Sequence, residues 1–518
     1  MNLVKYITNY FSSKNRIFLV CILTIHVIFS YYFISKQYIT YDEPSYIEYS
    51  KRWLHGKPER VEALDDSKTP VISIVWLPRI VQQIIQPNLK QTDFGKKDQE
   101  QGRYMMIIFS LLLLIYFYKF LQLLKIKYWL PVFLFIIIDP LLIAYSVLIN
   151  SDLLSGLVLL AIIYHLYQYL FFKKRSHFIY SCIWLATGLV TKLSFVFFIP
   201  VFWLIIFVVH KKIDWRKFLL FVLLILLVVN TWFYFKNTCL PLGQFQFSSN
   251  TFKLVQQFLH FLHWLPLPLP ENYIYSIDLL QYHAQLGGSY NNTYPGVYIL
   301  NKFSLTNNFW YYYLVAAWYK FPISILFLIT TGLFAFLYRF KKNIQKYWII
   351  IISIVYYLLV LSCFNKFQIG IRHLLIVLPL MYILIAVLLN YLVQTKFKWG
   401  IAILWLFMFF SVAKYYPNLI PYTNELVTNK AKVYEKLMDT SIDYGQSKLD
   451  ASNFLQQNTD FKTLTETPQT GKYLVSMQQL VLHQMYKDTS YNWLIKNYEP
   501  IGMYKYVYLQ FKIDALKR

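Results

Sequence analysis

Residues 150–175 read NSDLLSGLVLLAIIYHLYQYLFFKKR. Asp152 opens this stretch, residues 153–172 carry no Asp, Glu, Lys or Arg, and a basic cluster at 173–175 closes it. About 20 mostly apolar residues are enough for a helix to cross a bilayer. Lys and Arg in short loops mark the cytoplasmic side. The stretch therefore predicts a transmembrane helix near 152–172 that presents Asp152 to the outer face.

The composition of the whole chain agrees with a membrane protein. Of 518 residues, 57% are hydrophobic and only 14% are charged, whereas soluble domains carry about 25% charged residues. The formal net charge is +25, but the basic residues gather in short loops between apolar runs, and no nucleic-acid-binding module is present. We therefore expect no nucleic-acid partner. The four cysteines show neither a disulfide framework nor a zinc-ligand spacing.

The apolar runs predict about eleven transmembrane spans. Alternate connecting loops are short and basic, which places them and the N-terminus in the cytoplasm. An odd number of spans then places the C-terminus outside. The predicted spans lie near 16–34, 104–123, 128–148, 152–172, two within 178–209, 217–235, 321–339, 346–363, 371–393 and 399–415.

Three longer segments face outward in this topology. Residues 35–103 and 236–320 form outer loops, which we expect to contain interfacial helices. Residues 416–518 are long enough for a small domain. Its end, PIGMYKYVYLQFKI (500–513), is typical of a strand, and DYGQSKLDASNFLQQN (443–458) of a helix after a turn. The predicted fold is an all-α polytopic membrane module, 1–415, followed by a small extracytoplasmic α/β domain, 416–518.

The charged residues that lie in or near the spans fall on one side of the predicted membrane. Ionisable groups near a bilayer usually face a wet cavity and mark a functional site, so an outward-facing cavity is expected. Simpler interpretations stay open: interfacial Lys or Arg side chains reach water on their own, Lys192 or Arg372 pairs with Asp152 only to hold helices together, and His373 orients a helix. The full set is Asp42, Glu43, Lys68, Arg103, Asp152, Lys192, Lys320, Arg372 and His373.

Such a cavity suits one kind of chemistry in particular. Basic groups at the outer leaflet would hold an anion, most simply the phosphate of a lipid head group. A carboxylate at Asp42 would accept the proton of an attacking hydroxyl, and the cations would neutralise the phosphate as it leaves. A phosphate leaving group needs no separate general acid. One carboxylate therefore suffices for a single displacement with inversion.

Seven stretches carry a resemblance to a known family, in the same order along the chain. They resemble motifs of the GT-C glycosyltransferases, in the superfamily of the protein O-mannosyltransferases and the lipid A aminoarabinose transferases. The sixth stretch resembles the family's IGxRHLLP motif closely. The stretches are YDEPSYIEYSKRWLHG (41–56), DSKTPVISIVWLP (66–78), DPLLIAYSVLINSDLL (139–154), ATGLVTKLSFVFFIP (186–200), NNFWYYYLVAAWYKFPISIL (307–326), FQIGIRHLLIVLPL (367–380) and DTSIDYGQSKL (439–449).

The resemblance implies a GT-C fold, a polyprenyl-phosphate sugar donor and transfer outside the cytoplasm. Asp42 matches the family's catalytic carboxylate, with Glu43 as its motif partner. Asp152 matches a second cavity acid that orients the acceptor or a metal. We assign the donor phosphate to a set of basic residues and expect two further residues to line the substrate cavity. The phosphate set is Lys68, Arg103, Lys192, Arg372 and His373, and the cavity pair is Tyr46 and Lys320.

The chain departs from the family pattern at three motif positions. The aminoarabinose branch has an Arg where Ser45 stands and a Pro where Thr69 stands. The family's Trp in the last motif is Tyr444 here. These departures weaken the expectation that this chain uses the same sugar and the same phosphate contacts as the aminoarabinose branch. They leave the superfamily resemblance intact.

The sequence thus predicts an integral-membrane glycosyltransferase, a hexosyl- or pentosyltransferase of the cell envelope, in the bacterial inner membrane. The acceptor hydroxyl could belong to a protein, a lipid or a glycan. No metal-ligand set is evident, although a divalent metal stays possible. The alternatives are a transporter or flippase of a lipid-linked or anionic substrate, which would show midplane charges, broken helices and repeats, and a non-catalytic scaffold for envelope assembly.

Overall fold

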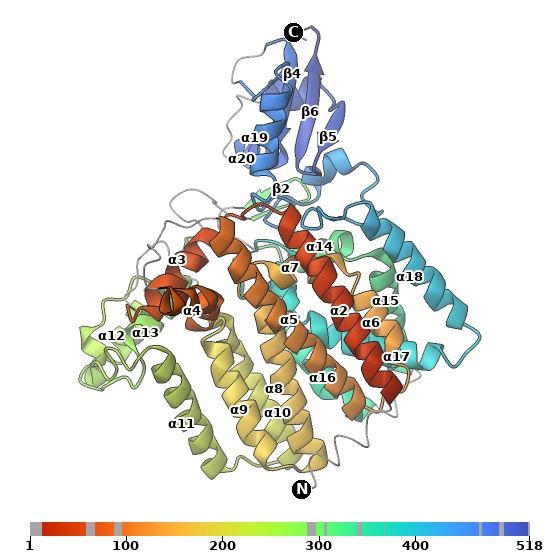
Figure 1. Ribbon diagram of the computed structural model, residues 1–518. Coiled ribbons are helices and arrows are strands. Elements are labelled where there is room, and N and C mark those ends of the chain that lie inside the picture. The colour runs from red at the N-terminus through yellow and green to blue at the C-terminus, as the bar shows by residue number, and fades with distance from the viewer. Residues whose placement is uncertain are drawn as a thin grey trace.

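A helical bundle carries a small domain beyond one of its ends in the computed structural model of the chain (Figure 1). The long helices run roughly parallel to one another in the bundle, and the chain ends in the small domain. The structure describes residues 13–57, 68–86, 96–286, 297–304, 308–338, 344–366, 368–465, 469–485 and 492–515.

Six described helices are long and apolar enough to cross a membrane, and a bent pair makes up to seven. Shorter apolar helices complete the bundle, so the expected count of eleven spans is not confirmed. The six are α2 (Ser13–Lys36), α5 (Lys96–Leu123), α8 (Asp152–Phe172), η2 (Leu193–Phe197) continued by α10 (Phe198–His210), α11 (Trp215–Trp232) and α16 (Ile344–Cys363); the shorter ones are α9 (Ser176–Leu189), α15 (Ile323–Tyr338), α17 (Leu378–Leu392) and α18 (Lys398–Ala413).

The stretch expected as one span over 128–148 is instead two helices, α6 (Leu130–Ile136) and α7 (Pro140–Val147), bent by 63°. Proline disfavours helical backbone in the residue before it, and Asp139 accordingly has an extended ψ of 120°. Its carboxylate caps α7 by accepting from the backbone N–H groups of Leu141 and Leu142, and it also accepts from the Tyr382 hydroxyl. A full cap at this point ends one helix and starts another.

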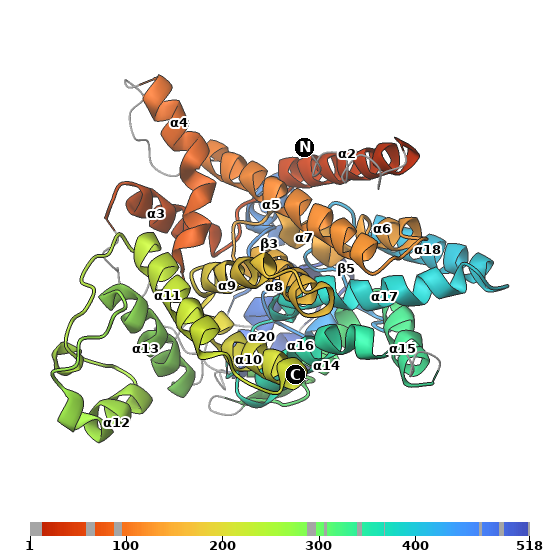
Figure 2. The same ribbon diagram turned by 90° about the horizontal axis from the view of Figure 1, so that it is seen from below.

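Helix α8 lies at the centre of the bundle. Seen along the helices, it is surrounded by α5, α9, α16 and α17 (Figure 2), and 94% of its apolar window is buried inside the protein. Its uncharged sequence is therefore explained by protein packing on all sides as much as by lipid. Asp152, its first residue, lies at the end of the helix nearest the outer loops, where the helix dipole stabilises an acid.

The outer loops hold short helices, as expected. In the first loop these are α3 (Glu43–Leu54), η1 (Pro70–Trp76) and α4 (Leu77–Ile85). The side chains of Ile84 on α4 and of Phe258 on α12 (Asn250–Phe258), in the second loop, are 73% and 81% exposed. Such apolar faces outside the bundle fit an interfacial position. The second loop holds η3 (Leu242–Gln244), α12 (Asn250–Phe258), η4 (His260–Leu262), α13 (Glu271–Gln285), the hairpin of β1 (Val297–Ile299) and β2 (Lys302–Ser304), and α14 (Tyr312–Lys320).

The C-terminal segment folds into the small α/β domain that the sequence predicts. The helix expected after a turn within 443–458 lies at 448–457, whereas the single strand expected over 500–513 is two strands, at 502–504 and 508–513, joined by a turn. The four strands of this domain lie in the order β3-β4-β6-β5, with β3 and β4 parallel and the other pairs antiparallel. The segment after α18 comprises η7 (Lys430–Glu435), α19 (Lys448–Gln457), β3 (Phe461–Lys462), β4 (Gly471–Ser476), α20 (Met477–Met485), α21 (Asn492–Asn497), β5 (Gly502–Tyr504) and β6 (Tyr508–Ile513).

Candidate active site

Asp42 lies where the first outer loop turns into α3, and its carboxylate does not serve the helix. An Asp at an N-cap position normally accepts a hydrogen bond from the first turn, but Asp42 makes no side-chain cap bond. Oδ2 instead accepts from Nη1 of Arg372 at 2.9 Å and from the hydroxyl of Tyr444. The side chain is 39% exposed. Asp42 is thus held by one oxygen and remains open to solvent.

Arg372 reaches Asp42 from the short helix η6 (Ile371–Ile376), which begins after a glycine in a strained conformation. Gly370 has a φ of +102°, and a Cβ there would lie 2.8 Å from Oδ1 of Asp439. Its N–H donates to the Tyr312 hydroxyl, which in turn donates to Asp439. Only glycine tolerates this backbone and this close approach. The IGxRH motif is therefore pinned against the DTSIDYGQ motif, and this fixes where the guanidinium points.

The second acid, Asp152, forms a buried ion pair with Lys192. Lys192 Nζ donates to Oδ1 at 2.6 Å, and the side chains are 18% and 7% exposed for Lys192 and Asp152. Oδ2 of Asp152 lies 3.9 Å from Nε of Arg372. That Nε is buried and has no hydrogen-bond partner among the described residues. Arg372 therefore bridges the two acids and keeps one donor for a further oxygen.

Tyr46 and Lys68 join this cluster from the first outer loop. Tyr46 is 8% exposed and lies close to Asp42 and Asp152. Burial, with the nearby charges of Asp42 and Asp152, raises the pKa of Tyr46, so its phenol stays neutral. Lys68 Nζ lies 5.2 Å from the centre of the Tyr46 ring, and the Lys68 side chain is buried. Six predicted site residues thus lie together: Asp42, Tyr46, Lys68, Asp152, Lys192 and Arg372.

Two tyrosines in this cluster were not among the predicted site residues. Tyr444 stands 402 positions after the carboxylate that it contacts. Tyr145, from α7, is fully buried within electrostatic reach of Arg372, and its hydroxyl has no partner among the described residues. The motif that contains Tyr444 marks its segment as a candidate, but a sequence does not show which side chain of a motif turns toward a site. Tyr145 carries no such signal, because it lies within an apolar run.

Glu43 and Arg103 pair with each other, apart from this cluster. Arg103 Nε and Nη2 donate to the two carboxylate oxygens of Glu43 at 2.8 and 2.7 Å, and both side chains are 1% exposed. Arg103 also donates to the carbonyls of Gln37 and Tyr38. The Glu43 oxygens further accept from three donors on Thr40, Gln99 and Ile149. The pair is fully engaged and buried, so its geometry offers neither a free base nor a free phosphate ligand.

Lys320 and His373 also bond protein groups. Lys320 is fully buried, and its Nζ donates to the carbonyls of Ile420 and Ser441 at 2.8 and 2.6 Å. It thereby joins α14 to the segment after α18 and lines no open space. His373 Nδ1 lies 2.9 Å from the Tyr313 hydroxyl, which also accepts from Asn365. These contacts orient the imidazole beside the cluster.

The donor set does not favour a metal. The described residues include no group of three or more His, Cys, Asp and Glu side chains placed to hold a metal ion. Asp42 and Asp152 each contact a cationic side chain, and Arg372 lies between them. Its guanidinium takes the place that a bridging cation would need, so no metal enters the steps below.

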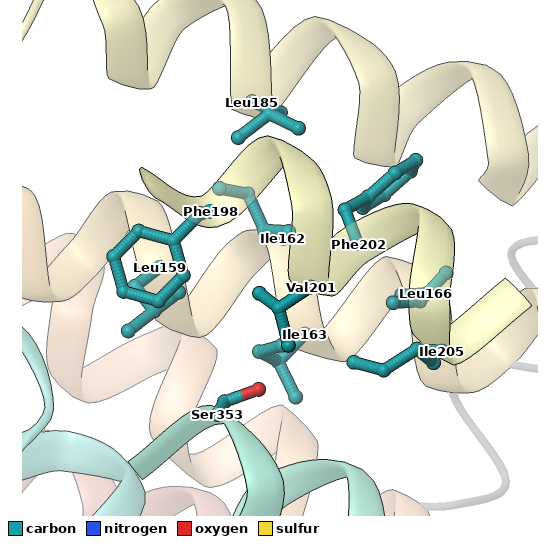
Figure 3. Close-up of a pocket in the computed structure, with 10 residues that line it drawn as sticks. All are labelled: Leu159, Ile162, Ile163, Leu166, Leu185, Phe198, Val201, Phe202, Ile205 and Ser353. Atoms are coloured by element: carbon teal, nitrogen blue, oxygen red, sulfur yellow. The ribbon is translucent and has the colours of Figure 1, made fainter. Parts of the chain in front are cut away.

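An apolar pocket lies deeper in the bundle, among α8, α9, α10 and α16 (Figure 3). It is small, and Ser353 is its one polar lining residue. The Ser353 hydroxyl bonds the carbonyl of Ile349 in its own helix. The pocket has no group for chemistry and shares no residue with the cluster, although α8 runs from Asp152 past its wall. The lining also includes Leu159, Ile162, Ile163, Leu166, Leu185, Phe198, Val201, Phe202 and Ile205.

Two solved structures are similar to this chain over nearly its full length. Both are crystal structures of ArnT from Cupriavidus metallidurans, one bound to undecaprenyl phosphate and one in the apo state. The TM-score is 0.47 for each, at 12% and 10% sequence identity, and each match covers 96% of this chain and 98% of that chain. No protein-family model matches the chain, and no curated protein sequence does.

The Glu43–Arg103 pair predicts a stability effect. Changing Glu43 to Ala leaves the Arg103 guanidinium buried without its counter-ion, which costs roughly 3–5 kcal/mol of stability. We expect a clear fall in the midpoint of thermal unfolding in detergent. Glu48→Ala is the matched control, because Glu48 forms only a loose, half-exposed contact of 3.9 Å with Lys51, worth under about 1 kcal/mol. An unchanged midpoint for Glu43→Ala, with loss of turnover alone, would restore a catalytic role to Glu43.

Lys320 predicts a pH dependence of stability. Burial lowers its pKa to about 7, with Asp439 opposing and Lys430 adding to the effect, whereas an unfolded Lys has a pKa near 10.4. Between these values the unfolded chain binds about one proton more, so stability rises with pH above 7, by roughly 1 kcal/mol per pH unit.

In Lys320→Met the side chain at position 320 no longer takes up a proton when the protein unfolds. Unfolding free energies at pH 7, 8 and 9 should rise more steeply for the wild type than for the variant. Parallel pH profiles for the two proteins would show that Lys320 keeps its charge in the fold.

Proposed function

We propose that the protein is an integral-membrane glycosyltransferase that moves a sugar from a polyprenyl-phosphate carrier to a hydroxyl acceptor outside the cytoplasm. The proposal rests on how the Asp42 carboxylate is held and how far it is exposed. Every contact of its carboxylate that the structure records falls on Oδ2, and the side chain is 39% exposed. It is the most open acid of a cluster in which Asp152 is paired and buried. An acid held in place but open on one oxygen suits a general base.

The transfer is a single displacement at the anomeric carbon. Asp42 Oδ1 accepts the proton of the acceptor hydroxyl while the hydroxyl oxygen forms a bond to that carbon. The bond between the carbon and the phosphate oxygen breaks, and its electron pair leaves on the phosphate. The configuration at the anomeric carbon inverts, because attack comes from the side opposite the phosphate. The acceptor must therefore approach from the Asp42 side of the sugar.

Cations near Asp42 receive the phosphate. Lys68 lies beside Tyr46, and Arg372 keeps a buried Nε without a partner among the described residues. A guanidinium donor that is buried and unbonded costs free energy unless a ligand or water meets it. The phosphate of the carrier supplies such an acceptor, and its negative charge grows as the sugar leaves. Asp152 keeps Lys192 and Arg372 in place for this contact.

Four residues take supporting roles in place of those expected from the sequence. We assign Glu43 and Arg103 to the fixing of the turn that carries Asp42, since their contacts tie α3 to α5 and to the chain before Asp152. We assign Lys320 to the joint between α14 and the segment after α18. His373 orients η6 through Tyr313. None of these four needs to touch the substrate.

The motif resemblance supports the donor class, since seven stretches follow the family's order along the chain. The basic loops support a cytoplasmic N-terminus and a position of the cluster at the outer face of a bacterial inner membrane. The sugar, hexose or pentose, and the acceptor are set by groups beyond this cluster. We expect the acceptor to enter beside the second outer loop and the C-terminal domain, which are the parts least like the motif set.

The transporter alternative gains one feature, the bend between α6 and α7. Broken helices in transporters leave backbone groups for a substrate or ion. Here the Asp139 carboxylate at the break caps α7 and accepts a hydrogen bond from the Tyr382 hydroxyl, so these groups are already bonded within the protein. The bend therefore supports a structural role, and the enzyme remains the better account.

Turnover by the purified protein tests the proposal. We would incubate it in detergent with a panel of polyprenyl-phosphate sugars and measure release of polyprenyl phosphate. Wild type should release it from at least one donor, and Asp42→Asn should lose roughly 10²–10⁴-fold of the rate, as expected for a lost general base. Glu48→Gln, an exposed acid of the same helix, is the control and should keep the wild-type rate. No release from any donor, or full activity in Asp42→Asn, would contradict the mechanism.

Binding of the carrier tests the phosphate ligands separately. Lys68→Ala should weaken the inhibition of turnover by free polyprenyl phosphate by about 10- to 100-fold, the range of a lost hydrogen bond to a charged group. Lys57→Ala is the matched control, because Lys57 is an exposed lysine of the same loop. Equal inhibition constants for Lys68→Ala and the wild type would remove Lys68 from the site.

A further inference from the structure

Tyr444 brings the C-terminal part of the chain into direct contact with Asp42. Its hydroxyl donates to Oδ2 of Asp42 and accepts a hydrogen bond from Nη1 of Arg372. The guanidinium carbon of Arg372 lies 5.1 Å from the centre of the Tyr444 ring. Tyr444 is 1% exposed, and burial raises the pKa of its phenol. The Tyr444 phenol is therefore a neutral donor that lies between the Asp42 carboxylate and the Arg372 guanidinium, which belong to two other segments.

The backbone around Tyr444 is fixed as firmly as its side chain. Its carbonyl accepts from the N–H of Tyr41 at 2.9 Å, one residue before Asp42. Its own N–H donates to Oε1 of Gln446 at 2.6 Å. Gly445 has a φ of +81°, and a Cβ there would lie 2.9 Å from the Tyr41 ring. The segment lies flat against the turn that carries the acid, so the hydroxyl has little freedom to move away.

We propose that Tyr444 is a positioning residue that fixes Oδ2 of Asp42, so that Oδ1 alone faces the acceptor hydroxyl, and that it favours the ionised carboxylate. The position of the carboxylate follows from the geometry above, whereas its use as a base rests on the proposed function. In consequence, the base is correctly set only while the segment 439–449 of the C-terminal part is seated on the membrane module.

The phenol does what neither phenylalanine nor tryptophan can do here. A tyrosine hydroxyl donates one hydrogen bond and accepts others, whereas the Trp of the similar family motif has one donor and no acceptor. Of these three side chains, only tyrosine can accept the hydrogen bond from Arg372 and also donate one to Asp42. Tyr444 is thus a departure from the family pattern with a specific physical effect in this chain.

Five charged or titratable groups bear on Asp42, and one of them is Tyr145 from α7. Arg372 reaches it from η6, Tyr444 from the segment before α19 and Tyr46 from α3, and Asp152 acts across Arg372. Loss of the Tyr444 hydroxyl removes one donor that favours the ionised acid and leaves the other groups in place. Asp42 should then take up a proton at higher pH.

The test is the pH dependence of carboxyl modification at Asp42. A water-soluble carbodiimide with an amine nucleophile labels protonated carboxyls, and mass spectrometry of the digested full-length protein quantifies labelling at Asp42. Tyr444→Phe should move the labelling midpoint to higher pH by about one unit, since a hydrogen bond to a charged group is worth about that much. Tyr473→Phe is the matched control, because Tyr473 is a buried tyrosine of the same domain whose hydroxyl donates only to the Gln469 carbonyl.

A second substitution tests the proposal even if the Tyr444→Phe variant fails to fold. Incorporating 3,5-difluorotyrosine at position 444 keeps the shape of the side chain and makes its phenol a stronger donor, so the Asp42 midpoint should move to lower pH. An upward shift for Phe or a downward shift for difluorotyrosine, with the Tyr473 control unchanged, supports the proposal. A midpoint within error of the wild type in whichever of these folds would overturn it.

Turnover then separates this inference from the proposed function. With a donor that wild type uses, Tyr444→Phe should lower kcat about 10-fold, leave the KM for the donor near the wild-type value and move the acid limb of the pH–rate profile upward. If the labelling midpoint shifts but the wild type releases no polyprenyl phosphate from any donor, Tyr444 still positions Asp42 and the glycosyltransferase assignment fails. If turnover is normal in Tyr444→Phe at every pH, the positioning role fails and the enzyme assignment stands.

Discussion

The ion pair between Asp42 and Arg372 is the contact on which the outer face of this protein depends. Its partners are 330 positions apart in the sequence, and Tyr444 adds a third segment to the same carboxylate. A charge at the edge of a bilayer is expensive unless it is paired or wet. Asp42 is both, because Oδ2 is bonded and the side chain stays partly exposed. The contact thus joins the first outer loop, the helix η6 and the C-terminal part while one carboxylate oxygen remains available.

Adjacent acids in the same turn have opposite fates. Glu43 points into the protein and meets a bidentate arginine, whereas its neighbour Asp42 is partly exposed and bonds Arg372 and Tyr444. A buried carboxylate is tolerated only when it is fully paired and bonded, and Arg103 with backbone donors meets that condition. The resulting rigidity fixes the turn, so Asp42 needs no helix cap of its own. One acid provides the anchor and the other provides the chemistry that we propose.

The sequence predicts the large features well, because they rest on composition and period. The long apolar helices, the outer loops with short helices and the strand character of 500–513 follow from hydropathy and alternation, whereas the turn that divides this stretch into two strands does not. The break at Asp139-Pro140 was missed, since the apolar character continues through it and only the dipeptide marks the cap. Six of the ten predicted site residues lie in one cluster, because a shared membrane side is a strong constraint. The membrane side does not determine which residues pair with one another, and Arg103 and Lys320 bond protein groups instead of lying in the cluster.

Tyr444 illustrates the limit most clearly. Its motif marks the segment as a candidate, but the direction of its hydroxyl depends on Gly445, on Gln446 and on a backbone bond to Tyr41. Such long-range contacts follow no sequence period. They become visible only when the segments are placed together.

The most direct measurement of the central claim is a cryo-electron microscopy structure of the protein in lipid nanodiscs with polyprenyl phosphate. The account predicts the phosphate density at the outer face, within hydrogen-bonding distance of Lys68 and of Nε of Arg372, with Oδ1 of Asp42 open beside it. Phosphate density away from both cations, or on the side of the basic loops, would contradict the account.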